Sequence, residues 1–325
     1  MTTTTGISRR SLFATAGAAS ALALAGGVPS RAAAPKAGPM RPAIYRFALG
    51  DFEVATLLDG QAVRDNPQSV FGTDQSVETV SALLEQNFLD PAKLKITFSP
   101  TVVNTGAEVI LFDTGLGAGA RGGGLGQTRS RLEAAGIAPE QVDIVVITHF
   151  HPDHIGGLME DGTPAFPNAR YVTGAVEHNF WSAEERMSGP TARVAKLTAT
   201  NVTPLNERMS MIKPGDSVAS GIEAVEAFGH TPGHMAYHIE SAGQRLMLIA
   251  DTSNHFVLSL QRPDWEVLFD MDKGRAAATR KSVLGMIAAD RIPFIGYHMP
   301  PPAIGYLEAL SSGGFRYHPV SYQLI

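Results

Sequence analysis

Apolar residues occur along this chain in short runs separated by turn-forming glycine, proline and asparagine, the pattern of strands and helices in a mixed α/β fold. Runs of β-branched and aliphatic residues predict strands, and longer segments of mixed polarity predict helices. The predicted strands cover residues 47–57, 101–104, 108–113, 142–147, 170–172, 222–228, 235–239, 245–251 and 292–298. The predicted helices cover residues 77–89, 127–135, 174–185 and 275–289.

Four of the predicted strands end in side chains that commonly bind metal ions. The run over residues 142–147 leads into Thr-His-Phe-His-Pro-Asp-His at residues 148–154. The other three end at the Gly-His-Thr-Pro-Gly-His motif of residues 229–234, at Asp251 and at His298. Because sites in α/β sheets lie at the carboxyl ends of strands, we expect these groups to meet. Imidazole and carboxylate donors, in a chain without cysteine, predict a zinc-type centre that makes a nucleophile from water.

The order of these motifs, HxHxDH followed by a histidine, an aspartate and a last histidine, resembles the metallo-β-lactamase superfamily over about residues 42–325. The resemblance implies an α/β fold, a four-layer αβ/βα sandwich in which two mixed sheets pack face to face with helices outside. It also implies two divalent metal ions, with zinc as the expected metal.

Carried over to this sequence, the resemblance assigns every metal ligand. One metal would be held by His149, His151 and His234, the other by Asp153, His154 and His298, and Asp251 would bridge the two. Asp113 and His230 would lie behind the ligands and support them. A hydroxide shared by the metals would attack the substrate, while Asp153 and Asp251 would fix the metal spacing and offset positive charge.

Within the superfamily the chain looks most like methyl parathion hydrolase and its lactonase and aryl-esterase relatives. Segments that carry this likeness cover residues 49–54, 103–106, 154–159, 165–169 and 314–320. The likeness implies hydrolysis of a lactone or aryl ester, with phosphotriesters as promiscuous substrates. The alternatives are a dedicated organophosphate hydrolase and a β-lactamase-like or glyoxalase-like hydrolase.

Several residues near the ligands are candidates for substrate contact. Phe180 and Trp181 match an aromatic pair that lines the leaving-group pocket in methyl parathion hydrolase, and Phe256 and Met299 are expected to extend that apolar wall. Related lactonases carry a tyrosine three residues after the bridging aspartate, where this chain has asparagine. The next residue, His255, is a candidate for a substitute proton donor to the leaving group, and the alternative is a histidine of the pocket wall or the surface.

Residues 1–34 predict a twin-arginine export signal, because Ser-Arg-Arg-Ser-Leu-Phe at residues 8–13 precedes a weakly apolar Ala/Leu-rich stretch. That stretch is too short and too polar for a stable membrane anchor. We expect residues 35–325 to form one hydrolase domain, exported to the periplasm or secreted by the twin-arginine machinery. Related enzymes are often homodimers, so the resemblance includes a homodimer among the assemblies open to this chain.

Charge and glycine content narrow the choice of partners. Residues 1–34 contain three arginines and no acid, so removing them changes the formal charge from −5 to about −8. This negative charge argues against nucleic acid and anionic lipid as partners, and the resemblance implies a small-molecule ester or lactone instead. Seven glycines in residues 115–126 lack the Gly-Lys-Ser/Thr ending of a nucleotide-binding loop, so we expect a mobile loop beside the site.

Overall fold

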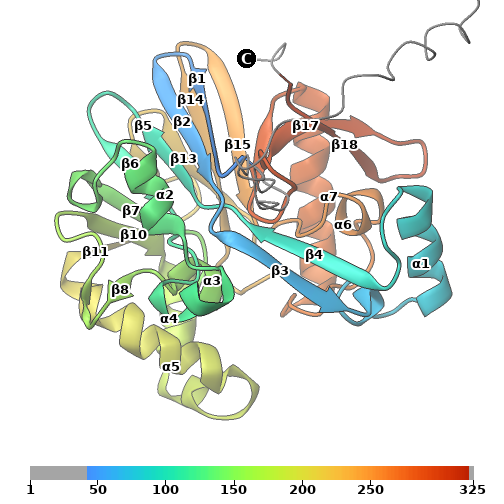
Figure 1. Ribbon diagram of the computed structural model, residues 1–325, viewed down its shortest axis with the longest axis horizontal. Coiled ribbons are helices and arrows are strands. Elements are labelled where there is room, and N and C mark those ends of the chain that lie inside the picture. Colours follow the sequence, from blue (N-terminus) through green and yellow to red (C-terminus); the bar gives the residue numbers. More distant parts are fainter. Residues whose placement is uncertain (1–41, 322–325) are drawn as a thin grey trace, which may run out of the picture. The chain divides into compact units, whose positions relative to one another are not determined.

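The structure, a computed structural model, describes residues 42–321, so the predicted export signal lies outside the described residues. Two seven-stranded sheets form its centre (Figure 1). The first sheet contains, in spatial order, β1 (Ile44–Leu49), β2 (Phe52–Leu57), β5 (Thr101–Asn104), β6 (Val109–Phe112), β7 (Ile144–Ile147), β10 (Arg170–Gly174) and β11 (Met209–Ile212). The second contains β12 (Ser217–Ala219), β13 (Ile222–Glu226), β14 (Met235–Ser241), β15 (Gln244–Ala250), β16 (Phe294–Gly296), β17 (Ile304–Ala309) and β18 (Phe315–Pro319).

Both sheets are mixed, and they pack against each other through one apolar core. In the first sheet, β6, β7, β10 and β11 are parallel and the remaining pairs are antiparallel. Ile110 and Val146 of the first sheet share this core with Leu248 and Ile295 of the second. Strand β7 is buried on both faces, which explains why its sequence is a continuous apolar run instead of an alternating one.

Helices cover the outer face of each sheet. The helices are α1 (Val77–Gln86), α2 (Thr128–Ala134), α3 (Pro152–Ile155), α4 (Ala175–Ser182), α5 (Ala192–Asn201), α6 (Leu258–Gln261) and α7 (Lys273–Asp290). Leu132 of α2 and Trp181 of α4 pack with Val145 of the first sheet, and Leu284 of α7 packs with Ile249 of the second. The order of layers is therefore helix, sheet, sheet, helix, as predicted from the sequence. None of the helices within residues 42–321 combines the length and the apolar character that crossing a bilayer requires.

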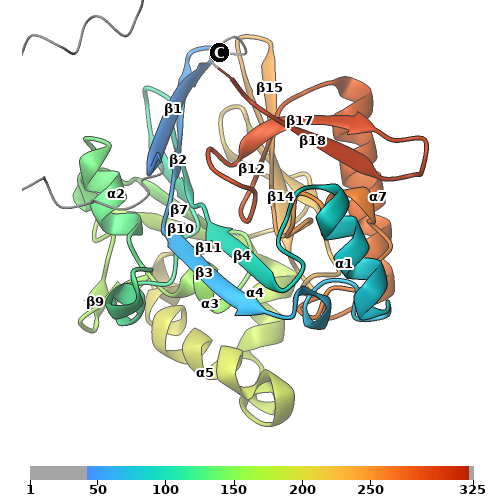
Figure 2. The ribbon, with the colours of Figure 1, turned by 45° about the vertical axis from the view of Figure 1, so that its right-hand side comes forward.

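A separate hairpin, β3 (Gly60–Asp65) and β4 (Lys93–Phe98), projects from the sandwich toward α1 in both views (Figures 1 and 2). This hairpin was not predicted from the sequence, although Leu94, Ile96 and Phe98 alternate with polar residues as in a strand with one buried face. A smaller hairpin joins β8 (Met159–Glu160) and β9 (Thr163–Pro164).

The strand predicted over residues 47–57 is instead the antiparallel pair β1 and β2. Gly50 turns the chain between them with a φ of 58°, a conformation that glycine adopts without strain. A Cβ atom at this position would lie 2.1 Å from the carbonyl oxygen of Ser241, so a side chain is excluded by contact as well.

The glycine-rich segment 115–126 is held at both ends by one buried carboxylate. Asp59, which is fully buried, accepts hydrogen bonds from the backbone N–H groups of Leu116, Gly126 and Thr128 at 3.1, 3.0 and 2.8 Å. A 3-10 helix, Ala118–Gly123, lies between these anchors.

Candidate metal centre

The loop after β7 carries four of the predicted ligands, and Asp113 organises it. Its carboxylate accepts hydrogen bonds from the backbone N–H and the hydroxyl of Thr148, at 2.9 and 2.8 Å. The same carboxylate lies 2.8 Å from Nδ1 of His154, so Nδ1 carries the proton. Nε2 of His154 therefore faces the centre of the site, toward Asp153 and Asp251. Asp113 thus joins the ends of β6 and β7 and fixes one ligand's tautomer.

Three imidazoles and one carboxylate form the first half of the centre: His149, His151, His230 and Asp251. Nε2 of His149 and Nε2 of His230 lie 3.1 and 2.9 Å from Nδ1 of His151. Oδ2 of Asp251 lies 3.3 Å from Nε2 of His230 and 3.9 Å from Nε2 of His149. Convergence of several nitrogen lone pairs beside a carboxylate is the arrangement that a divalent cation needs.

Asp153, His154 and His298 form the second half, and Asp251 connects it to the first. Oδ2 of Asp153 lies 3.5 Å from Nε2 of both His154 and His298. The two oxygens of Asp251 reach this half separately, Oδ1 at 3.4 Å from His154 and Oδ2 at 3.1 Å from His298. Nδ1 of His298 donates to the carbonyl oxygen of Thr97 at 2.8 Å, which directs Nε2 inward.

The structure corrects the metal ligand assigned to the Gly-His-Thr-Pro-Gly-His motif. His230, and not His234, lies in the cluster. Both ring nitrogens of His234 are used by the backbone: Nδ1 donates to the carbonyl of Ala227 at 2.9 Å, and Nε2 accepts from the N–H of Asp251 at 3.0 Å. No lone pair of His234 is left for a metal. His234 instead fixes the backbone of Asp251, which is the supporting role that the sequence analysis gave to His230.

The chemistry of these groups fits a pair of divalent cations. Nε2 of His154 and Oδ1 of Asp251 are buried and have no hydrogen-bond partner within the described chain, which is costly unless a cation binds them. Burial lowers the pKa of His151 to about 3, so its imidazole is a neutral donor. Burial acts to raise the pKa of Asp153, but His154 and His298 outweigh it and lower the pKa to about 2, so the carboxylate is ionised.

A buried ion pair supports His230 and was not found from the sequence. Asp270 accepts from Nδ1 of His230 at 2.9 Å, and Nη2 of Arg280 lies 2.6 Å from the other Asp270 oxygen. Arg280, on α7, is 1% exposed and also donates to the carbonyl of Thr252, the residue after Asp251. These contacts link two ligand-bearing loops to one helix. The signal in the sequence was an arginine, Arg280, at the same helical spacing as the apolar residues of the predicted helix.

Glu177 of α4 joins the two histidine loops and was also missed. Its fully buried carboxylate accepts from the N–H of Phe150 at 2.9 Å and from Nε1 of Trp181 at 2.8 Å. The second oxygen accepts from the hydroxyl of Thr231 at 2.7 Å and from the N–H of Gly233 at 2.9 Å. The loop after β7 and the loop that bears His230 are therefore fixed to one another by a single side chain.

The cluster forms the floor of a cavity of about 340 Å³ with mostly apolar walls. These walls include Phe71, Ile96, Phe98, Leu116, Val194 and Phe269. The residues predicted for this role lie elsewhere: Trp181 and Phe180 pack in the core outside the first sheet, Met299 packs under α7, and Phe256 packs beside it. The prediction failed because the wall comes from the β3–β4 hairpin and from loops, which sequence proximity to the ligands does not identify.

His255 does not line this cavity, which contradicts its predicted role as proton donor. Its Nδ1 accepts from the N–H groups of Val257 and Leu258 at 3.1 and 3.0 Å, at the start of α6. The neighbouring Asn254 does line the cavity, and its Nδ2 donates to Oδ2 of Asp251 at 2.9 Å. An amide side chain has no proton to release at ordinary pH, so it orients Asp251 and is no acid.

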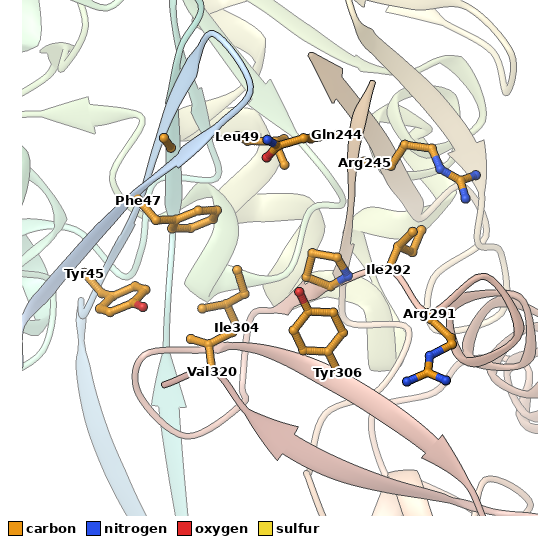
Figure 3. A pocket seen from close by; sticks show the side chains of 12 residues that line it. Tyr45, Phe47, Leu49, Gln244, Arg245, Arg291, Ile292, Ile304, Tyr306 and Val320 are labelled. Atoms are coloured by element: carbon orange, nitrogen blue, oxygen red, sulfur yellow. The ribbon is translucent and has the colours of Figure 1, made fainter. Parts of the chain in front are cut away.

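A second cavity, of about 260 Å³, lies between β1 and the β16–β17 region (Figure 3). The rings of Tyr45 and Phe47 line one side and Tyr306 the other. It is lined by no histidine, aspartate, glutamate or cysteine, so it offers no metal ligands.

The motifs, the paired sheets and the two-part cluster agree with comparison to a family model. Residues 99–291 match the model of the metallo-beta-lactamase superfamily, which is more than half of the chain. The chain belongs to the metallo-beta-lactamase superfamily. As a member of this superfamily of metal-dependent hydrolases, it places the His/Asp cluster at the carboxyl ends of its strands.

Solved structures and curated relatives agree with this assignment. The chain is similar to AidC, a dizinc quorum-quenching lactonase solved with the product N-hexanoyl-L-homoserine, with 26% identity, a TM-score of 0.77, and coverage of 86% of this chain and 98% of that one. It is also similar to the hydrolase AbOPH, with 27% identity, a TM-score of 0.79, and coverage of 87% and 99%. A probable metallo-hydrolase of Mycobacterium tuberculosis is 33% identical over 126 residues, 36% of this chain, and the match spans only 39% of that relative's length.

Proposed function

We propose that this chain is a dinuclear metal-dependent hydrolase that acts on lactones or aryl esters, and that it stands near methyl parathion hydrolase and the lactonases within the superfamily. The observation that carries the proposal is the sharing of Asp251 by two ligand groups at the floor of an apolar cavity. The likeness to a dizinc lactonase over 86% of the chain supports it.

The ligand set suits two zinc ions, held by His149, His151 and His230 on one side and by Asp153, His154 and His298 on the other, with Asp251 between. Such ions, when bound, polarise a carbonyl oxygen and lower the pKa of water toward 7. The protein contributes fixed ligand orientations, through Asp113, Asp270 and the backbone, and walls that exclude bulk water.

The wall around the cluster determines which leaving groups are suitable. Asn254 holds Asp251 but has no proton to donate, and His255 is not on the cavity wall. Among the described residues that line the cavity, none outside the metal ligands can donate a proton to a leaving group near neutral pH. An aryl ester, whose phenolate departs as a stable anion, is therefore expected to be turned over faster than a lactone, whose alkoxide benefits from a proton donor. Aryl phosphotriesters share that leaving group and are expected as slower, promiscuous substrates.

We also propose that residues 1–34 direct the chain to the periplasm through the twin-arginine machinery. The proposal rests on the sequence pattern alone. A reporter protein fused after residue 34 should be exported, and replacement of Arg9 and Arg10 by lysine should retain it in the cytoplasm.

The test of the activity is a turnover panel on zinc-loaded protein with γ-butyrolactone derivatives, p-nitrophenyl esters, an aryl phosphotriester and a chromogenic cephalosporin. We expect the lactone or the aryl ester to reach a kcat/KM of about 10⁴ M⁻¹s⁻¹ or more. Removing the metal with a chelator, or replacing Asp251 by Asn, should abolish it. The matched variant Asp264→Asn, an exposed residue paired with Lys281, should keep it. Dominant phosphotriester or cephalosporin turnover would contradict the proposed substrate class.

A further inference from the structure

Two arginines that line the cavity from different elements have no acidic partner. Arg64 and Arg193 both line it, and within residues 42–321 neither forms an ion pair or a hydrogen bond. Several other surface arginines are paired, as Arg129 is with Glu133 and Glu160. Among the described residues that line the cavity, the acids are Asp153 and Asp251, which belong to the metal centre.

The β3–β4 hairpin directs Arg64 to the cavity. Arg64 lies opposite Leu94 in the hairpin register, and Ala62 lies opposite Ile96. Because alternate side chains of a strand share a face, Arg64 lies on the same face as Ala62 and Ile96, both of which line the cavity. Its guanidinium carbon is 5.7 Å from the centre of the Phe269 ring, a cation–π contact that holds the charge at the wall.

Arg193 lines the cavity from a different element, in the first turn of α5 next to the lining residue Val194. Much of the remaining wall is apolar, with Ile96, Phe98 and Phe269 among its residues. The cavity therefore combines the metal ligands, an apolar lining and two unpaired positive charges.

From this arrangement we infer that the substrate carries an anionic group, a carboxylate or its equivalent, separated by an apolar segment from the ester or lactone carbonyl. Arg64 and Arg193 bind that group and so determine specificity. Arginine is suited to this, since its planar guanidinium donates two parallel hydrogen bonds to a carboxylate. The inference rests on the proposed hydrolase function and adds the substrate class to it.

A matched pair of aryl esters tests the inference. In p-nitrophenyl hexanoate the acyl chain ends in a methyl group, and in the monoester of adipic acid the same chain ends in a carboxylate. We expect wild-type protein to favour the adipate monoester in kcat/KM by about tenfold or more, and Arg64→Met and Arg193→Met each to reduce that ratio by about three- to tenfold. Hexanoate turnover is measured for every variant, so that the comparison rests on the ratio alone. Arg316→Met, which removes an exposed arginine paired with Glu308, is the control and should leave the ratio unchanged.

A binding measurement separates this inference from the proposed function. Adipate, titrated calorimetrically into the zinc-loaded protein, should bind more weakly to Arg64→Met and Arg193→Met than to wild type, and uncharged adipamide should not discriminate. Arginine-dependent adipate binding without ester turnover would retain the anion site and reject the hydrolase assignment. Ester turnover with a ratio that neither arginine affects would overturn the inference and leave the hydrolase assignment in place.

Discussion

At the scale of single residues, the orientation of His230 depends on buried charge. Asp270 accepts from its Nδ1, and Arg280 fixes Asp270. Both supporting side chains are almost fully buried, so solvent neither competes for these bonds nor screens them. Nε2 of His230 is thereby directed to the centre, 3.3 Å from Oδ2 of Asp251.

Replacing Asp270 by Asn should weaken metal binding by about 10- to 100-fold, because the amide cannot carry the charge that pairs with Arg280 and orients His230. The measurement is competition for the metal against a chromogenic chelator. Asp264→Asn, in the same loop region but exposed, is the control and should bind metal like wild type. Equal affinity for the Asp270 variant and wild type would show that His230 needs no such support.

His255 gives a prediction about acid stability. Burial lowers the pKa of His255 to about 3, so protonation favours the unfolded chain, in which the pKa is ordinary. The stability contributed by the neutral ring is present above about pH 6.5 and is lost as the pH falls toward 3. His255→Asn keeps an acceptor for the α6 N–H groups and cannot become charged, so its unfolding free energy should fall less steeply with acid than that of wild type. Parallel urea titrations from pH 7 to pH 4 compare the slopes; identical slopes would contradict the prediction.

The choice between His230 and His234 shows what the sequence could not decide. Both follow the same strand, four residues apart, and both are buried histidines in one motif. What distinguishes them is hydrogen bonding with Ala227 and with the N–H of Asp251, which exists only after β13, β14 and β15 have paired. The other ligand positions follow from strand ends, a local feature that the apolar runs reveal.

At the scale of elements, α4 connects the two ligand loops through Glu177. Its carboxylate accepts two backbone N–H groups from segments that lie more than 80 residues apart, Phe150 and Gly233. Gly233 lets α4 approach this closely, since a Cβ atom there would lie 2.1 Å from the backbone nitrogen of Glu177. The contact is specific to this pairing of a helix with a loop.

Replacing Glu177 by Gln keeps one acceptor oxygen and puts an NH₂ group, itself a donor, where the other oxygen accepted from N–H or O–H groups. At least one buried backbone N–H loses its acceptor, so we expect the free energy of unfolding to fall by about 2 kcal/mol. Chemical denaturation monitored by tryptophan fluorescence measures it. The exposed Glu185→Gln, just beyond the same helix, should stay within about 0.5 kcal/mol of wild type. An unchanged Glu177 variant would mean that the loops are held by other contacts.

Elements were predictable where the local pattern and the burial agree. The continuous apolar runs of β7 and β15 predicted strands at the correct places, because both faces of those strands are buried. The β3–β4 hairpin was missed, and with it part of the cavity wall, because the wall residues are brought to the site by tertiary packing. Helix α5 was missed too, since its Thr and Val residues give a weak helical signal.

At the scale of the whole molecule, the centre is divided between the two halves of the sandwich. The loop after β7 supplies His149, His151, Asp153 and His154, and the second half supplies His230, Asp251 and His298. Neither half can complete a ligand set without the other, so metal binding should stabilise the packed sheets against separation. This division follows from the strand order of the two sheets. The HxHxDH motif follows a strand of the first sheet, and the later histidine and aspartate ligands follow strands of the second, in the order that the sequence has them.

The most direct test of the account is the metal content per chain, measured by inductively coupled plasma mass spectrometry on dialysed, zinc-loaded protein. The account predicts about two ions per chain for wild type and at most about one for His230→Ala, with about two retained by the exposed control His318→Ala. One ion or none in wild type, or two ions retained by His230→Ala, would contradict a dinuclear centre built on His230 and Asp251.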